Sequence, residues 1–208
     1  MRPSSQSHKF FQSVIVYIAV LLLFVGRDNR VYSLSSLSTT FGVVRYFAYG
    51  SNMLSDVFEG LRGCRPLSRT AAICHDYRLA FSALGFSPIE PAFANLEVCK
   101  GKSCHGVLYE LPWTDWLKVC AIEGVPFAYQ VITVNLIPYT THISDGEEQP
   151  LISSRDVQAF TLSYRQPQTI LGLPSLELSP SRRYLSILQR GSKEAGLSPS
   201  WCTMLDNL

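Results

Sequence analysis

A short polar turn at residues 50–52 is the first place in this sequence where side chains could do chemistry. Gly50, Ser51 and Asn52 follow an apolar, aromatic run that is typical of a β-strand. A glycine lets the backbone turn sharply and approach a ligand closely. Successive backbone N–H groups can then point into one concavity and hold a carboxylate or a developing oxyanion. An ordinary Gly-Ser-Asn turn has the same pattern, so the residues alone leave both interpretations open.

Glu123 is the second candidate, because it is expected at the C-terminal end of a helix. A carboxylate there faces the negative end of the helix dipole, and Ile122 and Val125 suggest apolar surroundings. Both effects would favour the protonated form near neutral pH, as a general acid/base requires. An exposed glutamate before a glycine is also common, and this alternative stays open.

Two further polar residues stand in apolar segments. Tyr184 could present its hydroxyl to a ligand, although a tyrosine on an apolar helix face usually belongs to the core. Asn95 would need a backbone or ligand partner if it is buried. The histidines are scattered, and the sequence has no nucleophile elbow, phosphate loop, dinucleotide fingerprint or zinc motif. We therefore expect a site without a metal or a cofactor.

The elements that must position these residues are mostly strands. Apolar or alternating patterns predict five strands, at residues 43–49, 78–82, 105–111, 128–136 and 157–164. Their spacing favours a mostly antiparallel sheet or barrel.

Three helices are expected beside these strands. The first spans 112–122, with Thr114 as its N-cap, Trp113, Leu117 and Cys120 on one face, and Gly124 as a left-handed C-cap. Serine–proline pairs at 179–180 and 198–199 predict the starts of the other two. The earlier of these carries Tyr184.

Composition limits the class of protein. Of the 208 residues 47% are hydrophobic and 16% are charged, and the formal net charge is +2, which predicts one globular domain with a tail. No basic stripe is present, so we expect a small polar metabolite and no nucleic acid as the partner. The six cysteines have no zinc-site spacing. Cys99 and Cys104 are near enough in sequence to bridge a turn, and buried free thiols are the alternative.

The N-terminal segment is expected to be separate from the domain. A basic start and the apolar run from 14 to 25 predict a signal peptide over residues 1–33, or a short membrane anchor if it is not cleaved. Residues 34–42 form a linker, and the domain spans 43–208. This leader indicates the secretory pathway or a plastid, with membrane contact only through residues 14–25.

Several motifs together resemble one family. The segment Tyr46–Met53 (YFAYGSNM) is similar to the signature of the γ-glutamylcyclotransferase-like family, and Glu123–Val125 (EGV) resembles the motif that carries its catalytic carboxylate. The segments 105–111, 180–184 and 191–197 are similar to its later strand and C-terminal region. The match runs from about residue 45 to residue 205, in family order.

The resemblance implies a fold, a reaction and a site. The fold would be α+β, a mixed, mostly antiparallel β-barrel-like sheet flanked by helices. The reaction would release 5-oxoproline from a γ-glutamyl compound, by attack of its α-amine, with no cofactor. Glu123 would be the acid/base. The substrate-binding residues would be Tyr46, Phe47, Ala48, Tyr49, Gly50, Ser51, Asn52 and Tyr184. A homodimer is compatible with this family. The alternatives are a cyclotransferase for γ-glutamylamines or other conjugates, and a non-catalytic binding module.

Overall fold

The computed structural model of the protein describes residues 42–87, 89–144, 147–164 and 177–208. The predicted leader and all but the last residue of the predicted linker lie outside these residues. In the described part of the chain, no helix is both long enough and apolar enough to cross a membrane.

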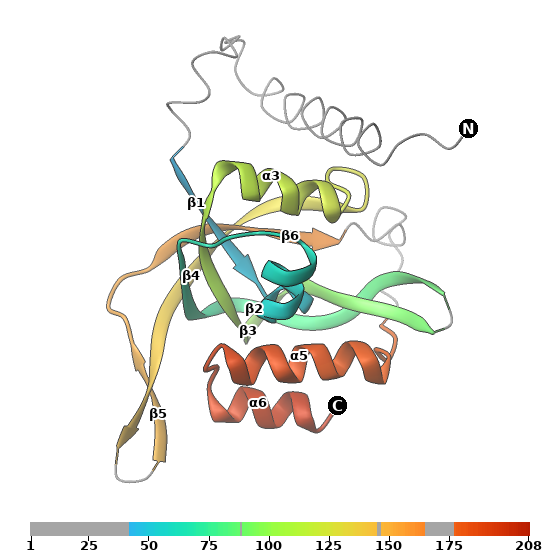
Figure 1. Ribbon diagram of the computed structural model, residues 1–208. Helices are drawn as coiled ribbons and strands as arrows, with labels where there is room; N and C mark the ends of the chain where they lie inside the picture. The colour runs from blue at the N-terminus through green and yellow to red at the C-terminus, as the bar shows by residue number, and fades with distance from the viewer. Residues whose placement is uncertain (1–41, 88, 145–146, 165–176) are drawn as a thin grey trace, which may run out of the picture.

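The centre of the molecule is a closed barrel (Figure 1). Its strands are β1 (Val43–Ala48), β2 (Ser68–Ser87), β3 (Glu90–Pro112), β4 (Tyr129–Ser144) and β6 (Val157–Tyr164). They follow the order β2-β3-β1-β6-β4, and pairing of β2 with β4 closes the ring. A further strand, β5 (Glu147–Ile152), forms a hairpin with β4. Only β1 and β6 pair in parallel among the described strands, so the predicted α+β class with a mixed, mostly antiparallel sheet is confirmed.

The predicted strands at 78–82 and 105–111 are parts of much longer strands. The sequence pattern is interrupted at Asp76 and Gly101, which both have positive φ angles, and the register between β2 and β3 shifts beside Asp76. The N–H of Gly101 donates to Oδ1 of Asp76 across this irregularity, at 2.8 Å. The polar residues that appeared to separate strands therefore occupy an irregularity inside one long hairpin.

The cysteines are free thiols. Cys64, Cys74, Cys104 and Cys120 are buried, as the alternative of small apolar side chains predicted. Cys99 and Cys104 lie on the same strand, β3, so the turn that they were expected to bridge does not exist.

Helix α3 (Trp113–Ile122) follows β3 directly, and two details differ from the prediction. Pro112 occupies the N-cap position, and the predicted cap Thr114 is exposed. The buried residues of the helix are Trp116, Val119, Cys120 and Asp115. The carboxylate of Asp115 accepts hydrogen bonds from the Arg65 N–H and from Lys118. The buried face therefore differs from the predicted one, because a buried carboxylate with hydrogen-bond partners belongs to it.

The C-terminal helices are α5 (Arg182–Glu194) and α6 (Pro199–Asp206). The N-cap of α5 is Ser181, whose Oγ accepts from the N–H of Tyr184 at 3.0 Å, so the helix starts after the predicted Ser179–Pro180 pair. Ser198 caps α6 as predicted.

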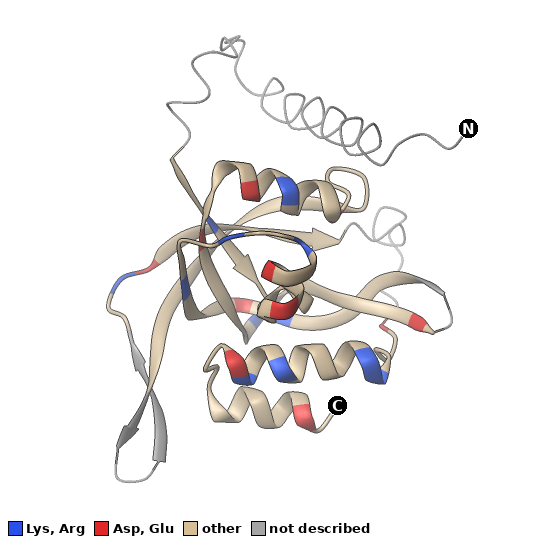
Figure 2. Cartoon of the chain, viewed as in Figure 1, with Lys and Arg blue, Asp and Glu red and all other residues tan. Residues whose placement is uncertain are grey.

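The helices lie on different sides of the barrel. In Figure 1, α3 lies along one side, and α5 and α6 lie together at the other, near the C-terminus. Positive and negative residues are interspersed on them (Figure 2). Three ion pairs tie α5 to the barrel and to η2. Arg190 pairs with Asp56 in the π-helical segment η2 (Asp56–Leu61) and Glu194 with Arg69 in β2, both at 2.7 Å, and Arg183 pairs with Glu90 in β3 at 2.6 Å. The link between β1 and η2 is a short 3-10 turn, η1 (Ser51–Met53).

Candidate active site

A pocket lies where β1 ends and the turn η1 begins. It contains about 330 Å³ of empty space, its open mouth included. Seven of the nine predicted site residues line it, together with three further residues from β3, β4 and β6. The lining residues are Tyr46, Tyr49, Gly50, Ser51, Asn52, Ala94, Glu123, Tyr129, Leu162 and Tyr184.

The turn at the pocket floor presents backbone donors to the pocket. The first hydrogen bond within η1 runs from the N–H of Met53 to the carbonyl of Gly50, at 3.0 Å. The N–H groups of Ser51 and Asn52 precede this bond and have no partner within the turn itself. The backbone of Ser51 hydrogen-bonds the hydroxyl of Tyr184, so the tyrosine and the turn meet at the same place.

Gly50 is required for a different reason from the one expected. Its φ angle of −115° is open to any residue. A Cβ atom at this position would lie 3.1 Å from the hydroxyl oxygen of Tyr184 and 3.3 Å from Cβ of Ala94. The glycine thus makes room for the Tyr184 side chain at the pocket, and we infer no unusual backbone conformation there.

Glu123 occupies the predicted place, at the C-cap of α3. Gly124 follows with φ of +70°, the left-handed conformation that ends a helix. The carboxylate side chain is 19% exposed, and its Oε1 lies 2.8 Å from Nη1 of Arg62 and 3.2 Å from Nδ2 of Asn52. Its surroundings are therefore polar on one side as well as partly buried, whereas the sequence suggested only apolar neighbours.

Asn52 connects Glu123 to the aromatic wall. Its Nδ2 also donates to the hydroxyl of Tyr46 at 2.9 Å, and its backbone carbonyl accepts from the hydroxyl of Tyr109 at 3.0 Å. The amide orientation follows from these contacts, because the nitrogen must face the carboxylate. The side-chain Oδ1 is buried and has no hydrogen-bond partner among the described residues. An unpaired buried acceptor beside an open pocket is available to a ligand.

Two tyrosine hydroxyls complete the wall. The hydroxyl of Tyr184 accepts from the N–H of Ala94 at 3.2 Å, so its own proton can be donated toward the pocket. Burial raises the pKa of Tyr184 to about 12, which keeps the phenol neutral at physiological pH. Burial, and then the charge of Glu123, also raise the pKa of Tyr129 far above its ordinary value. Both groups are thus neutral hydrogen-bond donors.

Two predicted substrate-binding residues do not line the pocket. Phe47 and Ala48 are buried in the core, where β1 lies between β3 and β6. The carbonyl of Phe47 accepts from Thr161 Oγ1 at 2.8 Å, so this backbone is occupied by the sheet. The motif places Tyr46 and residues 49–52 in the pocket, while Phe47 and Ala48 hold the strand in the sheet.

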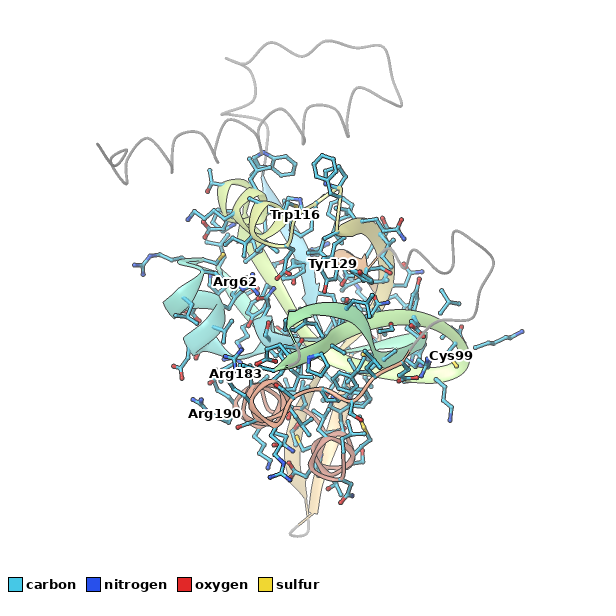
Figure 3. All side chains as sticks on the ribbon, turned by 90° about the vertical axis from the view of Figure 1, so that its right-hand side faces the viewer. Arg62, Cys99, Trp116, Tyr129, Arg183 and Arg190 are labelled. Atoms are coloured by element: carbon cyan, nitrogen blue, oxygen red, sulfur yellow. The ribbon has the colours of Figure 1, made fainter. Side chains whose placement is uncertain are left out.

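Arg62 is the residue that sequence analysis missed. It follows η2 as its C-cap, and its side chain is 15% exposed. In Figure 3, Arg62 lies at a level between Trp116 of α3 and Arg183 and Arg190 of α5. Besides Glu123, its guanidinium meets the pocket at Ser51, with Nη2 3.5 Å from Oγ. No local pattern marks this arginine, because its partner lies far away in the sequence.

Asn95 is buried, as its apolar segment suggested, but it is satisfied within the fold. Its Oδ1 accepts from the N–H of Tyr164 at 2.8 Å, and its Nδ2 donates to Ser82 at 3.1 Å. It therefore has no need of a ligand. Across the described residues, no group of three or more histidine, cysteine, aspartate or glutamate side chains has an arrangement that could hold a metal ion.

Comparisons with known proteins agree with the sequence motifs. No family model matches the chain. Among curated proteins, it is 31% identical over 158 residues to the γ-glutamyl cyclotransferase gliK of Claviceps purpurea, covering 72% of this chain and 63% of the relative. It is 27% identical over 177 residues to the γ-glutamyl cyclotransferase aclK of Aspergillus oryzae, covering 78% of this chain and 60% of the relative. These relatives, together with the motifs, support a protein of the γ-glutamylcyclotransferase family.

Solved structures show the same fold. A structure described as a γ-glutamyl cyclotransferase matches with a TM-score of 0.60 and 22% identity, over 80% of this chain and 88% of that one. YkqA of Bacillus subtilis matches with a TM-score of 0.59 and 21% identity, over 83% of this chain and 56% of that one. The chain spans less than two thirds of the length of the curated γ-glutamylcyclotransferase relatives given above.

Proposed function

We propose that this chain is a γ-glutamylcyclotransferase that releases 5-oxoproline and a free amino acid from γ-glutamyl amino acids. The observation that carries the proposal is the meeting of the Glu123 carboxylate with the turn Gly50–Asn52 in one pocket. Similarity to the family supports cyclotransferase chemistry at this site. The geometry supports a reaction that closes a ring within one bound molecule.

The reaction makes modest chemical demands. The α-amine of the substrate must fold onto its own γ-carbonyl carbon, so positioning in a small pocket provides much of the acceleration. A new C–N bond closes the five-membered lactam, and the C–N bond to the leaving amine breaks. The α-amine is an ammonium group at neutral pH and cannot attack until it loses a proton. Glu123 takes that proton and returns it to the leaving nitrogen.

The remaining lining groups stabilise the charges that develop. The turn Gly50–Asn52 lies at the pocket floor, where an oxyanion formed from the γ-carbonyl or a substrate carboxylate can bind. The neutral hydroxyl of Tyr184 can donate to the same oxygen, since its acceptor side is already occupied by Ala94. Such preorganised donors act strongly in a site that excludes most water.

Two alternatives use the same pocket. A cyclotransferase for γ-glutamylamines or other γ-glutamyl conjugates would need the same carboxylate and differ only in the leaving group. A binding module would have lost turnover. The retained acid at Glu123 argues against the module, because binding alone requires no proton carrier.

A substrate panel tests the proposed function. The purified chain is incubated with γ-glutamyl-alanine, glutathione and γ-glutamyl-lysine, and 5-oxoproline is quantified, while calorimetry measures binding of each compound. We expect 5-oxoproline and alanine in equal amounts from γ-glutamyl-alanine. Turnover of only the lysine conjugate would identify the alternative cyclotransferase. Binding without any 5-oxoproline would contradict the proposal and favour the binding module.

A further inference from the structure

A charged residue of the pocket, Glu123, is paired with an opposite charge beside the pocket, Arg62. Glu123 Oε1 lies 2.8 Å from Nη1 of Arg62, and both side chains are largely buried, at 19% and 15% exposure. In the described part of the chain, this is the only ion pair that involves a residue lining the pocket. Arg62 does not itself line the pocket, and its guanidinium spans two residues that do, Glu123 and Ser51.

The ion pair occupies the oxygen of Glu123 that faces the pocket residues. Oε1 is contacted by both Arg62 and Nδ2 of Asn52. A substrate ammonium can pair with this oxygen only if another anion draws Arg62 away from it. The guanidinium already has a second contact at Ser51, whose backbone N–H begins the turn at the pocket floor. A carboxylate held by this turn would therefore lie within reach of Arg62.

The unpaired polar atoms of the pocket match the same ligand. Oδ1 of Asn52 is a buried acceptor without a partner, and Nε of Arg62 is a buried donor without a partner, among the residues that the structure describes. Asn52 is only 5% exposed. An acceptor next to Glu123 suits an ammonium group, and a donor on Arg62 suits a carboxylate. A free α-amino acid head group carries both charges on one carbon.

We infer that Arg62 binds the α-carboxylate of the γ-glutamyl substrate and gives up its ion pair with Glu123 as it does so. The α-ammonium then takes the place of the guanidinium beside Glu123 and Asn52. Arg62 becomes a specificity-determining residue, because substrates without an α-carboxylate cannot draw it away. An arginine is suited to this exchange, since its planar fork can bind a carboxylate through two parallel hydrogen bonds.

The test removes the two partners of the inferred contact, the α-carboxylate of the substrate and the guanidinium of Arg62, one at a time. The first substrate is γ-glutamyl-alanine, and the second is 4-aminobutanoyl-alanine, which lacks the α-carboxylate and closes to 2-pyrrolidinone by the same ring-forming step. The values of kcat/KM are measured for wild type, for Arg62→Gln and for Arg65→Gln. Arg65 is the matched control, because its side chain is exposed. Thermal melting establishes that each variant folds.

Because this role presupposes the proposed cyclotransferase function, the wild type is assayed first. We expect it to prefer γ-glutamyl-alanine by ~100-fold, in line with the strength of charge-assisted hydrogen bonds. Arg62→Gln should reduce this preference at least about tenfold, mainly through γ-glutamyl-alanine, and Arg65→Gln should leave it unchanged. Equal losses on both substrates, with the preference intact, would assign Arg62 a merely structural role and overturn the inference.

Two further outcomes are decisive. If Arg62→Gln does not fold, Arg62→Lys replaces it: the retained charge should preserve a preference of about tenfold or more, and a folded lysine variant without any preference contradicts the inference. A wild type that produces neither 5-oxoproline nor 2-pyrrolidinone overturns the proposed function itself. If the wild type is active but Arg62→Gln keeps the full substrate preference, only the inferred role of Arg62 is overturned.

Discussion

Two groups of buried polar side chains lie in different regions of the barrel, and they are built in opposite ways. Where α6 meets β3 and β4, the hydroxyl of Tyr139 lies 3.0 Å from Nδ1 of His105 and accepts from the N–H of Ser198 at 3.0 Å. The Trp201 ring stacks on the imidazole with centroids 5.0 Å apart, and its Nε1 is the one atom of this cluster without a partner among the described residues. At the pocket, by contrast, Oδ1 of Asn52 and Nε of the adjoining Arg62 both lack partners among those residues.

This comparison distinguishes polar groups that stabilise the fold from polar groups that are available to bind a ligand. A buried network whose members satisfy one another makes the packing specific and contributes to stability. Buried atoms without partners cost stability, and a protein retains them where a ligand completes them. We therefore expect mutations in the His105 cluster to change stability, and mutations in the pocket to change turnover.

The largest expected effects come from deleting one hydroxyl in each region. Tyr139→Phe leaves the buried Ser198 N–H without its partner and His105 Nδ1 with only the Ser198 hydroxyl, so the free energy of unfolding should fall by about 2 kcal/mol. Tyr184→Phe should lower it by less than about 1 kcal/mol, because water in the open pocket can replace the hydroxyl. Its kcat/KM should fall by about tenfold, and that of Tyr139→Phe by less than about twofold.

Urea unfolding and steady-state kinetics measure both quantities on each variant. If the two phenylalanine variants lose stability and activity in the same proportion, the distinction between the two regions is wrong.

The pH dependence of stability should originate in the His105 cluster. Burial, with a smaller contribution from the charge of His75, lowers the pKa of His105 to about 4 from 6.5. The unfolded chain therefore takes up a proton that the folded protein refuses. The stability from neutral His105 is complete above about pH 6.5 and is lost as the pH falls toward about 4.

Urea midpoints between about pH 7 and pH 5 isolate this group. A hydrogen bond from Ser181 lowers the pKa of Glu90, so its stabilising contribution fades only below about pH 4.5. We expect the midpoint of the wild type to drop over this interval and that of His105→Gln to drop less. Equal slopes for both proteins would place the titrating group elsewhere.

The smallest effect should come from an exposed ion pair outside both regions. Arg190 and Asp56 are paired at 2.7 Å, but their side chains are 60% and 69% exposed. Water and salt screen such pairs, so Arg190→Ala should change the free energy of unfolding by less than about 1 kcal/mol. Turnover should stay at the wild-type level. A larger loss of stability, or any loss of turnover, would contradict the view that this ion pair is independent of the pocket.

The local parts of the site were predictable from the sequence. A strand that runs into a Gly-Ser-Asn turn and a glutamate before a helix-ending glycine are both patterns within a few residues. The structure places Gly50, Glu123 and Tyr184 in one pocket, as the family resemblance implied. The strand pattern predicted a mostly antiparallel sheet or barrel, the family resemblance implied the barrel-like form, and the strand predicted at 157–164 has the observed bounds.

The parts that were missed depend on contacts between distant segments. Arg62 belongs to the site because it forms an ion pair with Glu123, which lies sixty-one positions later in the sequence. No residue near Arg62 in the sequence indicates this ion pair. The buried face of α3 was misjudged because the backbone N–H of Arg65 and the ammonium of Lys118 satisfy Asp115, which allows a carboxylate inside. Phe47 and Ala48 belong to a motif whose middle serves the sheet and whose end serves the pocket.

The most direct measurement of the central claim is the rate of 5-oxoproline release from γ-glutamyl-alanine by Glu123→Gln. The amide keeps the size of the side chain and cannot carry the proton, so kcat should fall by about 100-fold or more. The control is Glu59→Gln, an exposed glutamate of η2, which should retain wild-type activity. Release within about tenfold of the wild type would contradict the assignment of Glu123 as the acid/base.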